Sequence, residues 1–432
     1  IPSFNILVAK QLTVQLFKPV HLFSLIGLAL TCGLVAGWYP AFYLSSFKPV
    51  QVLKGASRKQ GSAPLIRKGL VSTQFIVSIV FIISTIIVYQ QVQHVKGRDL
   101  GYDRSNLIKL PVNGDIIKNF KPIENDMLAS GLIENIGLNN SEILSGGNNT
   151  SGLEWQGGTD TEDVLVSVRY VSPKFFDTAG MEIVEGRKFS DNAIADSTNV
   201  FVTESFAKLM GMGSAIGKTI ENDYYVIGVV KDYLYGDMYG ASDPVIFFNN
   251  NSDTRFLYVR AKSDIAIDKT LMAMETVLKK HNPAFPFEYE FVDDAFDARF
   301  KSEKLIGSLS QLFALLAIMI SCLGLFGLSA FTAEQRKKEI GVRKVLGSSV
   351  SGVVGLLSKD FMQLVVVAIV IASPIAWFMM QNWLENYAYR IEINWMVFLF
   401  AGIIAVGIAL LTVSFQAIKA ASVNPIKSLR TE

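Results

Sequence analysis

Residues 331–347 have the sequence FTAEQRKKEIGVRKVLG, and the fold of the whole chain can be argued outward from them. They overlap the end of a run from Leu305 to Ala333 that contains no Asp, Glu, Lys or Arg, and they place five basic residues within positions 336–344. Such a change from uncharged to basic is typical of a transmembrane helix that enters the cytoplasm. Apolar residues then recur at nearly helical spacing at positions 340, 342, 345 and 346. The stretch is therefore predicted to form a short amphipathic helix along the membrane surface.

The composition indicates a membrane protein. Of 432 residues, 50% are hydrophobic, and the mean hydropathy of +0.34 is high for a soluble chain of this length. The net charge of +2 hides an asymmetry, because residues 95–304 hold 32 acidic and 22 basic side chains while the rest holds 18 basic and 6 acidic ones. The basic residues lie beside apolar spans, so nucleic acid is not an expected partner. Cys32 and Cys322 both fall in apolar runs, which excludes a disulfide framework in the acidic block.

Uncharged runs predict an α-helical membrane protein with five transmembrane helices and an α+β extracytoplasmic domain. The predicted spans are 21–44, 70–92, 305–333, 361–384 and 393–418, each long enough for a bilayer core of about 30 Å. The excess of Lys and Arg places the linker 45–69, the basic stretch after Ala333 and the tail in the cytoplasm. The predicted organisation is thus a loop (1–20), a span (21–44), a linker (45–69), a transmembrane and stalk helix (70–96), an extracytoplasmic domain (97–298) and a three-span domain (299–432). Gly33 and Gly37 form a GxxxG pair that predicts a helix-packing face.

The acidic block alternates strand-like and helix-like patterns, which predicts an α+β domain with its own core. Strands are expected at 164–171, 199–203, 224–230, 245–248, 255–261 and 287–292. Helices are expected at 204–210, with Thr203 as the cap, and at 264–280. A helix from Asp294 to Lys304 is expected to run without a break into the third span. Together with the extension of the second span, it would form a two-helix stalk.

The segment EQRKKEIGVRKVLGSS resembles the cytoplasmic loop of the MacB/FtsX-type ABC transporter permeases. Segments 171–189 and 207–232 are similar to the external domain of the same family. The resemblance implies that 97–298 is a MacB-like periplasmic core domain, that 299–432 is an FtsX-like permease domain, and that the loop 334–355 couples to an ABC ATPase. The expected coupling residues are those that agree with the family's loop: Glu334, Arg336, Glu339, Ile340, Gly341, Val342, Arg343, Lys344, Leu346 and Gly347. A basic topological anchor is the alternative explanation of the same stretch.

Two membrane-exit segments share a sequence frame that predicts an internal repeat. Residues 45–54 and 421–430 both carry Ser-x-x-Pro-x-x-x-Leu followed by a basic residue. The chain also begins with Ile1 rather than Met. These features predict a fragment of a tandem, two-unit permease that lacks most of its first unit. A chance similarity between two basic membrane exits is the alternative.

Motifs for catalysis or cofactor binding are weak, so the chain is not expected to be an enzyme. Residues 211–219 (GMGSAIGKT) resemble a phosphate-binding loop, but Met212 stands where the pattern needs Gly, and an external turn is the favoured explanation. Three scattered histidines predict no metal site. No cofactor is expected in this chain, and ATP would be bound by the partner ATPase.

The resemblance implies a permease subunit of the mechanotransmission type in the bacterial cytoplasmic (inner) membrane. ATP hydrolysis by a partner ABC ATPase would move the helix around residues 334–347, and the spans would pass that motion to the extracytoplasmic domain for export or efflux. The other expected partners are the lipid bilayer and a periplasmic adaptor. The alternative function is that of a membrane sensor or scaffold that regulates a cell-envelope hydrolase or a signalling partner.

Overall fold

The computed structural model describes residues 5, 18–45, 63–158, 164–191, 195–241 and 243–421, and the chain divides into two compact units. The helical unit contains residues 1–89, 304–381 and 393–432. The sheet unit contains residues 90–303 together with the short segment 382–392. The two segments of the predicted repeat, 45–54 and 421–430, lie almost wholly outside the described residues.

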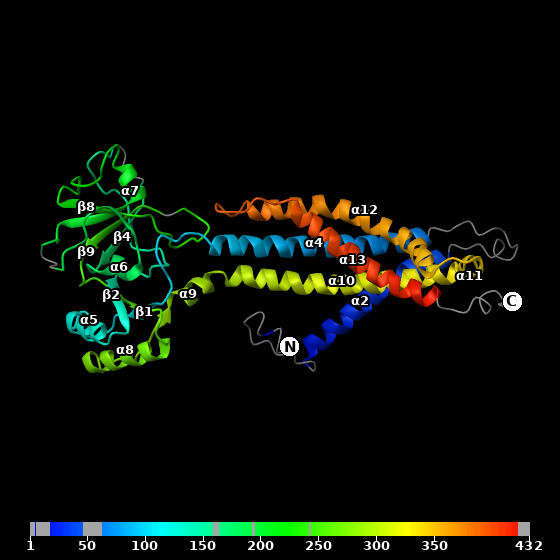
Figure 1. Cartoon of the computed structure of the whole chain (residues 1–432), viewed down its shortest axis with the longest axis horizontal. Coiled ribbons are helices and arrows are strands. Elements are labelled where there is room, and N and C mark those ends of the chain that lie inside the picture. The colour runs from blue at the N-terminus through cyan, green and yellow to red at the C-terminus, as the bar shows by residue number, and fades with distance from the viewer. Residues whose placement is uncertain are drawn as a thin grey trace. The chain divides into compact units, whose positions relative to one another are not determined.

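The helical unit is built from long apolar helices (Figure 1). Its elements are α2 (Pro19–Ser45), α4 (Ala63–Lys96), α10 (Lys301–Gln335), α11 (Lys337–Val345), α12 (Val350–Leu384) and α13 (Met396–Ala421), and α4, α10 and α12 also contribute residues to the sheet unit. Within the described residues, four helices are long and apolar enough to cross a membrane: 66–96, 301–335, 354–384 and 396–419. The first predicted span, 21–44, falls in α2 and is not among these four, so a fifth span stays a prediction.

Small side chains form the packing faces of α12 and α13. Each helix buries small residues at four-residue intervals, with alanines at 368, 372 and 376 in α12 and at 401, 405 and 409 in α13, where Val413 and Ala417 continue the series. A methyl group on Gly402 of α13 would lie 3.6 Å from Ile369 of α12, so these two helices are in contact. Such stripes let helix backbones approach closely in lipid. A methyl group at Gly33 or Gly37 would meet no described atom within 4 Å, so the expected GxxxG face stays a prediction.

Helices α4 and α10 contact each other along most of their apolar length. The buried hydroxyl groups of Ser78 and Ser321 are 3.1 Å apart. The rings of Phe81 and Phe313 lie 5.9 Å apart on one side of this pair, and the guanidinium group of Arg67 lies 4.6 Å from the centre of the Phe331 ring on the other. Contacts that run in opposite directions along the two sequences show that the helices are antiparallel neighbours.

One half of the sheet unit is a four-stranded antiparallel sheet with two helices on one face. Strands β1 (Leu107–Pro111), β2 (Ile133–Asn139), β10 (Phe256–Ala261) and β11 (Glu290–Phe291) are ordered β11-β1-β10-β2. Helices α5 (Phe120–Ala129) and α8 (Ile267–His281) lie side by side on this sheet (Figure 1). They bury an apolar core that includes Ile123 and Met274. The order of elements is that of a ferredoxin-like βαββαβ unit, with a long insertion between β2 and β10.

The insertion forms the other half of the sheet unit. Its strands are β3 (Asn149–Thr150), β4 (Val166–Val171), β5 (Ile183–Gly186), β6 (Asn199–Thr203), β7 (Thr219–Ile220), β8 (Tyr224–Val230) and β9 (Val245–Asn249), and its helices are α6 (Phe175–Ala179) and α7 (Glu204–Leu209). The main strand order is β4-β9-β6-β8-β5, and the pair Asn139–Val171 joins β4 to β2. Helix α6 packs against β2 at Gly137, where a methyl group would lie 2.8 Å from the Cα atom of Phe175.

The predicted strands and helices of the acidic block are confirmed in part. The strands at 199–203 and 224–230 have the predicted bounds, and those at 164–171, 245–248 and 255–261 differ by one or two residues at an end. The strand expected at 287–292 is only the two-residue β11, because a helix already begins at Val292. The elements without a predicted counterpart are β1, β2, β3, β5, β7, α5 and α6. Thr203 does precede α7, but its hydroxyl group contacts Ser205 and the backbone N–H of Val245 and does not cap the helix. The helix expected to run unbroken from Asp294 is two helices, α9 (Val292–Arg299) and α10. Helices α9 and α10 separate at Phe300, whose backbone is not helical. The ring of Phe300 is fully buried against that of Phe296, and this packing accounts for the break.

Candidate functional site

The predicted coupling residues lie at the end of α10, in α11 and in the turn that follows. Arg336 separates the two helices, yet its carbonyl oxygen accepts a hydrogen bond from the N–H of Ile340 at 2.9 Å, so α11 continues closely from α10. Gly347 has a φ of +91°, and the N–H of Ser348 donates to the carbonyl oxygen of Arg343 at 3.0 Å. A positive φ at the helix end suits glycine, which explains why α11 stops here.

One side of α11 is anchored to the ends of three apolar helices. Ile340 is 5% exposed and packs in a cluster with Ala333 of α10, Ala417 of α13 and Val354 of α12. The guanidinium group of Arg336 also forms a 2.9 Å ion pair with Asp360 of α12. Both partners of that pair are half-buried, so it contributes little stability and mainly fixes an orientation. A displacement of α11 would therefore act on α10, α12 and α13 together.

The other side of α11 is exposed and apolar. Val342 is 47% exposed, Val345 66% and Leu346 80%, and these residues follow one another at helical spacing. Beside them, the exposed side chains of Glu339 and Arg343 form a 2.9 Å ion pair across one helical turn. We call these five residues the docking face. An exposed apolar group with flanking charges is the composition of a surface that binds another protein or the membrane interface.

The structure thus divides the ten predicted coupling residues between different roles. Ile340 and Gly341 face inward, Arg336 fixes the helix to α12, and Gly347 ends the helix. Glu339, Val342, Arg343 and Leu346 are exposed, Glu334 is exposed in the last turn of α10, and Lys344 lies within α11. Val345 belongs to the docking face although it was not among the predicted residues. It was left out because it departs from the family's pattern, whereas helical spacing alone would have included it.

A second group of contacts lies in the sheet unit, where the loop between α12 and α13 meets the end of α4. The side-chain amide of Gln91, which is 0% exposed, donates to the carbonyl oxygen of Tyr389 and accepts from the N–H of Ile391, both at 2.9 Å. The Gln91 amide thus bonds one backbone carbonyl and one backbone N–H of the loop, which is the pair of bonds that a neighbouring β-strand would supply. Both polar atoms of a buried amide are satisfied by this arrangement.

The ring of Tyr389 lies against two basic side chains from the α4 end of the sheet unit. The imidazole of His94 is stacked on it, with centroids 4.5 Å apart and an interplanar angle of 7°. The guanidinium group of Arg98 lies 4.4 Å from the centre of the same ring and donates to the carbonyl oxygen of Gly240 at 2.8 Å. A cation against an aromatic face is attractive, and a partly desolvated one more so.

Tyr239 extends these contacts to the start of α10. The N–H of Tyr389 donates to the carbonyl oxygen of Tyr239 at 2.7 Å, and the ring of Tyr239 lies 4.4 Å from that of Tyr387 and 6.1 Å from that of Phe300. Burial raises the pKa of Tyr239, and the nearby carboxylate of Glu303 raises it further. We call the contacts of Gln91, His94, Arg98 and Tyr239 with the loop 387–391 the clasp.

Two family models match the chain. The MacB-like periplasmic core domain matches residues 75–277, and the FtsX-like permease C-terminal domain matches residues 311–425, so that together they cover about three-quarters of the sequence.

The chain belongs to the MacB/FtsX permease family. It is a multi-pass membrane protein with an extracytoplasmic domain. The docking face and the loop of the clasp both lie within the FtsX-like part of this permease, whereas Gln91, His94, Arg98 and Tyr239 lie within the MacB-like part.

Curated relatives of the permease share low identity with it. The macrolide export ATP-binding/permease protein MacB of Neisseria gonorrhoeae is 23% identical over 243 residues, which are 51% of this chain and 37% of that protein. The protein of the same description from Chromobacterium violaceum is 25% identical over 291 residues, which are 62% of this chain and 44% of that protein. The chain therefore spans less than half the length of these relatives.

Solved structures resemble part of the permease. The periplasmic region of MacB from Actinobacillus actinomycetemcomitans is 16% identical with a TM-score of 0.33, and it covers 47% of this chain and 96% of its own. The extracellular domain of the ABC-type transporter YknZ from Gram-positive bacteria is 18% identical with a TM-score of 0.29, and it covers 43% of this chain and 98% of its own.

Sequence reasoning missed the clasp of this permease entirely. Gln91 and His94 are one helical turn apart, and Arg98 follows one turn later. With this spacing, the three side chains would lie on the same face of a helix. Two tyrosines, Tyr387 and Tyr389, stand in the short loop between two apolar spans. These two patterns are visible in the sequence, but nothing in it shows that they meet.

Proposed function

We propose that the chain is the permease subunit of an ABC transporter of the mechanotransmission type. An ATPase on the cytoplasmic side would bind the docking face, and its ATP-driven movement would be passed through the membrane helices to the extracytoplasmic domain. The observation that carries this proposal is the two-sided nature of α11. Its outer side is apolar and open, while its inner side is held by Ile340 and Arg336 against three membrane helices.

The continuity of the helices supports the route of transmission. Helix α12 runs without interruption from Val350, before the Arg336–Asp360 pair, to Leu384, where the loop of the clasp begins. Helix α4 is likewise continuous from Ala63 to Lys96 and carries Gln91 and His94 near its end. Helix α12 remains helical on both sides of Pro374, which lies inside it, so displacement at α11 would be passed along α12 to the clasp. This route needs no unbroken helix from α9 into α10.

The remaining parts of the proposal concern partners and surroundings. ATP would be bound by the partner ATPase, and this chain would supply neither a nucleotide site nor a catalytic group. The membrane would be the bacterial cytoplasmic membrane, with residues 97–298 outside as the periplasmic core domain and 334–355 inside as the coupling loop. A periplasmic adaptor and a tandem arrangement of two permease units remain part of this proposal. The packing of Ile340 against three membrane helices favours a transporter over a scaffold, because a surface used only to hold a partner needs no such attachment to several helices.

The test is a charge exchange that leaves the composition of α11 unchanged. In the variant Glu339→Lys with Arg343→Glu, the net charge and the ion pair within the helix are both kept, but the order of charges on the docking face is reversed. We expect the exchange, and separately Leu346→Glu, to abolish the stimulation of ATP hydrolysis by the ATPase that co-purifies with the full-length protein in nanodiscs. A topological anchor depends on net positive charge and would tolerate the exchange. Unchanged stimulation in both variants, with normal membrane insertion, would refute the coupling role.

A further inference from the structure

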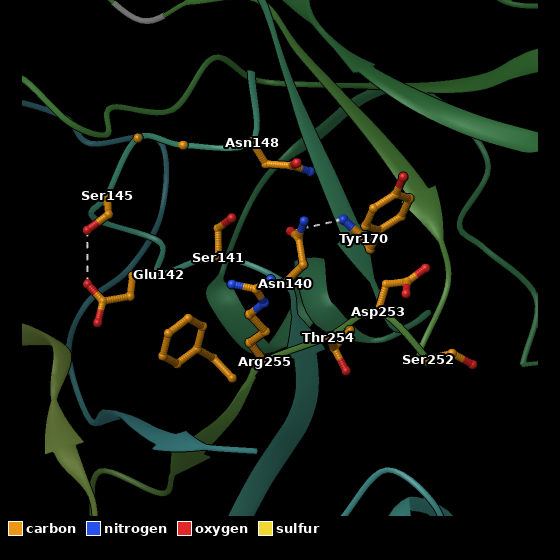
Figure 2. Close-up of a pocket in the computed structure, with 13 residues that line it drawn as sticks. Asn140, Ser141, Glu142, Ser145, Asn148, Tyr170, Ser252, Asp253, Thr254 and Arg255 are labelled. Atoms are coloured by element: carbon orange, nitrogen blue, oxygen red, sulfur yellow. Dashed lines mark hydrogen bonds between the residues drawn. The ribbon is translucent and has the colours of Figure 1, made fainter. Parts of the chain in front are cut away.

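A pocket in the sheet unit lies where its two halves meet. It has a volume of about 810 Å³ and is formed by the loop after β2, Tyr170 of β4, the turn before β10 and Phe256 at the start of β10. Figure 2 shows Asn140, Asn148 and Tyr170 around the same space, with Asp253 and Arg255 along its other side. The pocket lies in the extracytoplasmic part of the permease, apart from the docking face and the clasp.

The lining of this pocket is suited to a polar, uncharged ligand. None of its 13 lining residues is aliphatic, and the two aromatic ones are Tyr170 and Phe256. Its three charged residues are one cation, Arg255, and two carboxylates that already accept hydrogen bonds, Glu142 from Lys109 and Asp253 from the side chain of Asn250. An apolar ligand would gain little burial here, and a strongly charged one would find no net opposite charge.

Hydrogen-bonding groups in the pocket are held in place before any ligand arrives. The side-chain oxygen of Asn140 accepts from the N–H of Tyr170 at 3.1 Å, while the N–H of Asn140 donates to the carbonyl oxygen of Tyr170 at 3.0 Å. This double contact fixes the Asn140 amide and leaves its NH₂ group for a ligand. The side chain of Asn148 donates to the carbonyl oxygen of Val168 at 3.3 Å, which leaves its oxygen as an acceptor.

The wall formed by residues 145–147 is also rigid. Arg169 is 0% exposed, and its guanidinium group donates to the carbonyl oxygens of Gly147 at 2.7 Å and Ser145 at 3.3 Å. Arg299, at the end of α9, donates to the hydroxyl oxygen of Ser145 at 2.7 Å. A fixed wall lowers the entropy cost of binding. The hydrogen bond from Arg299 to Ser145 also connects this wall of the pocket to the end of α9, just before α10 begins.

A row of aromatic rings leads away from the pocket across the sheet. The ring of Tyr170 lies 5.7 Å from that of Phe248 on β9, which in turn lies 4.9 Å from that of Tyr224 on β8. All three side chains are half-buried, and those of Phe248 and Tyr224 also pack against the core of the insertion. Half-exposed rings beside a polar pocket provide flat apolar faces next to hydrogen-bonding groups.

We propose that the pocket and the aromatic row bind a neutral oligosaccharide chain. Each hydroxyl group of a sugar is both a donor and an acceptor, so neighbouring hydroxyl groups match the NH₂ group of Asn140, the side-chain oxygen of Asn148 and the carboxylate oxygen of Asp253 that Asn250 does not bond. The C–H faces of successive sugar rings match the aromatic row. An extended peptide fits less well, because β4 is already paired with β3 on one side and β9 on the other. The proposal does not depend on the coupling of α11 to an ATPase.

The test uses the full-length permease in nanodiscs, with chitotetraose, cellotetraose, chitobiose and the neutral tetrapeptide Gly-Ser-Asn-Gly as probes. Binding is measured by saturation-transfer NMR titration. We expect at least one tetrasaccharide to bind, with affinity lowered about tenfold or more by Asn148→Ala and by Asp253→Ala, since each removes a hydrogen-bonding group. Asp264→Ala, which changes an exposed carboxylate that does not line the pocket, should leave affinity unchanged.

The aromatic row is tested separately by chain length. Tyr224→Leu keeps an apolar side chain at the far end of the row but removes its ring, so it should weaken the tetrasaccharide and spare chitobiose. Binding of the tetrapeptide but of no saccharide would overturn the assignment of the ligand class. Absence of saccharide binding in the wild-type protein would overturn the proposed binding site. So would a loss of affinity in Asp264→Ala as large as that in Asn148→Ala and Asp253→Ala. None of these results depends on ATPase stimulation, so they leave the proposed function unaffected.

Discussion

Replacement of Gln91 by leucine should release the loop between α12 and α13 from the end of α4. Leucine has nearly the same size and keeps the helix and its packing, but it cannot pair with the backbone of Tyr389 and Ile391. In the native structure the amide of Gln91 forms two hydrogen bonds of 2.9 Å to these residues and is fully buried. The substitution therefore removes the polar part of the clasp with little change in volume.

The cost can be worked from these two contacts. A hydrogen bond between neutral groups contributes about 1 kcal/mol net, and a buried partner that is left unsatisfied costs about 1–3 kcal/mol. Loss of both bonds should thus weaken the docking of the loop by about 2–4 kcal/mol. Because each 1.4 kcal/mol is a factor of ten, the equilibrium for opening of the loop should rise by roughly thirtyfold to a thousandfold. The contacts of Tyr389 with His94 and Arg98 are unchanged, so the loop should open more often without unfolding the domain.

Hydrogen exchange of the full-length permease measures this opening directly. The N–H of Ile391 donates to Gln91, so its protection against exchange should fall by the same factor in Gln91→Leu. Gln93→Leu is the matched control, since Gln93 lies two residues along the same helix and its side chain is exposed. Equal protection of residues 387–391 in the wild type and Gln91→Leu, or an equal loss in Gln93→Leu, would refute the role assigned to the buried amide.

Three further predictions concern stability. The hydrogen bond with Arg187 is the main reason that the pKa of Asp196 is lowered to about 2. The ionised carboxylate should therefore add about 2 kcal/mol to the free energy of unfolding above pH 4, and this contribution should be lost as the pH falls towards 2. In chemical denaturation, Asp196→Asn should abolish this part of the pH dependence of stability. Gly101→Ala should cost more than Gly131→Ala in thermal unfolding, because both glycines have positive φ but only at Gly101 would the methyl group collide with backbone atoms. Ile340→Ala should destabilise the helical unit by about 2–4 kcal/mol, whereas Val342→Ala on the exposed side should be nearly neutral.

The helices of this permease could be predicted from sequence because their signals are local. Apolar runs of 20 or more residues and the basic residues beside them depend only on the composition of one segment. The same holds for α11, since Val342 and Val345 recur at helical spacing within nine residues. Which side of this helix would face inward was not predictable. That depends on Ala417 of α13, a residue far along the chain.

The missed strands show the limit of local patterns. Strands β1 and β2 are short and contain Lys109, Glu134 and Gly137, which weaken an alternating apolar pattern. Their stability comes from pairing with β10, more than 100 residues away in the sequence. Lys109 is tolerated because it bonds two carboxylates; burial opposes its charge, but Glu142 and Glu290 outweigh this and raise the pKa of Lys109.

The break between α9 and α10 has a consequence for how motion could reach the extracytoplasmic domain. A single rigid helix from the membrane into the domain would transmit any displacement directly. Instead Phe300 interrupts the helix, and the ring of Phe300 lies against Tyr239, which the clasp also holds. Residues from the end of α4, from the start of α10 and from the loop after α12 therefore meet around Tyr239 and Tyr389. Motion arriving along these helices would act on the aromatic and amide contacts of the clasp, beside the apolar contacts that Val92 and Val95 of α4 make with the domain core. Weakening the clasp should therefore reduce the coupling to the domain while the helices stay intact.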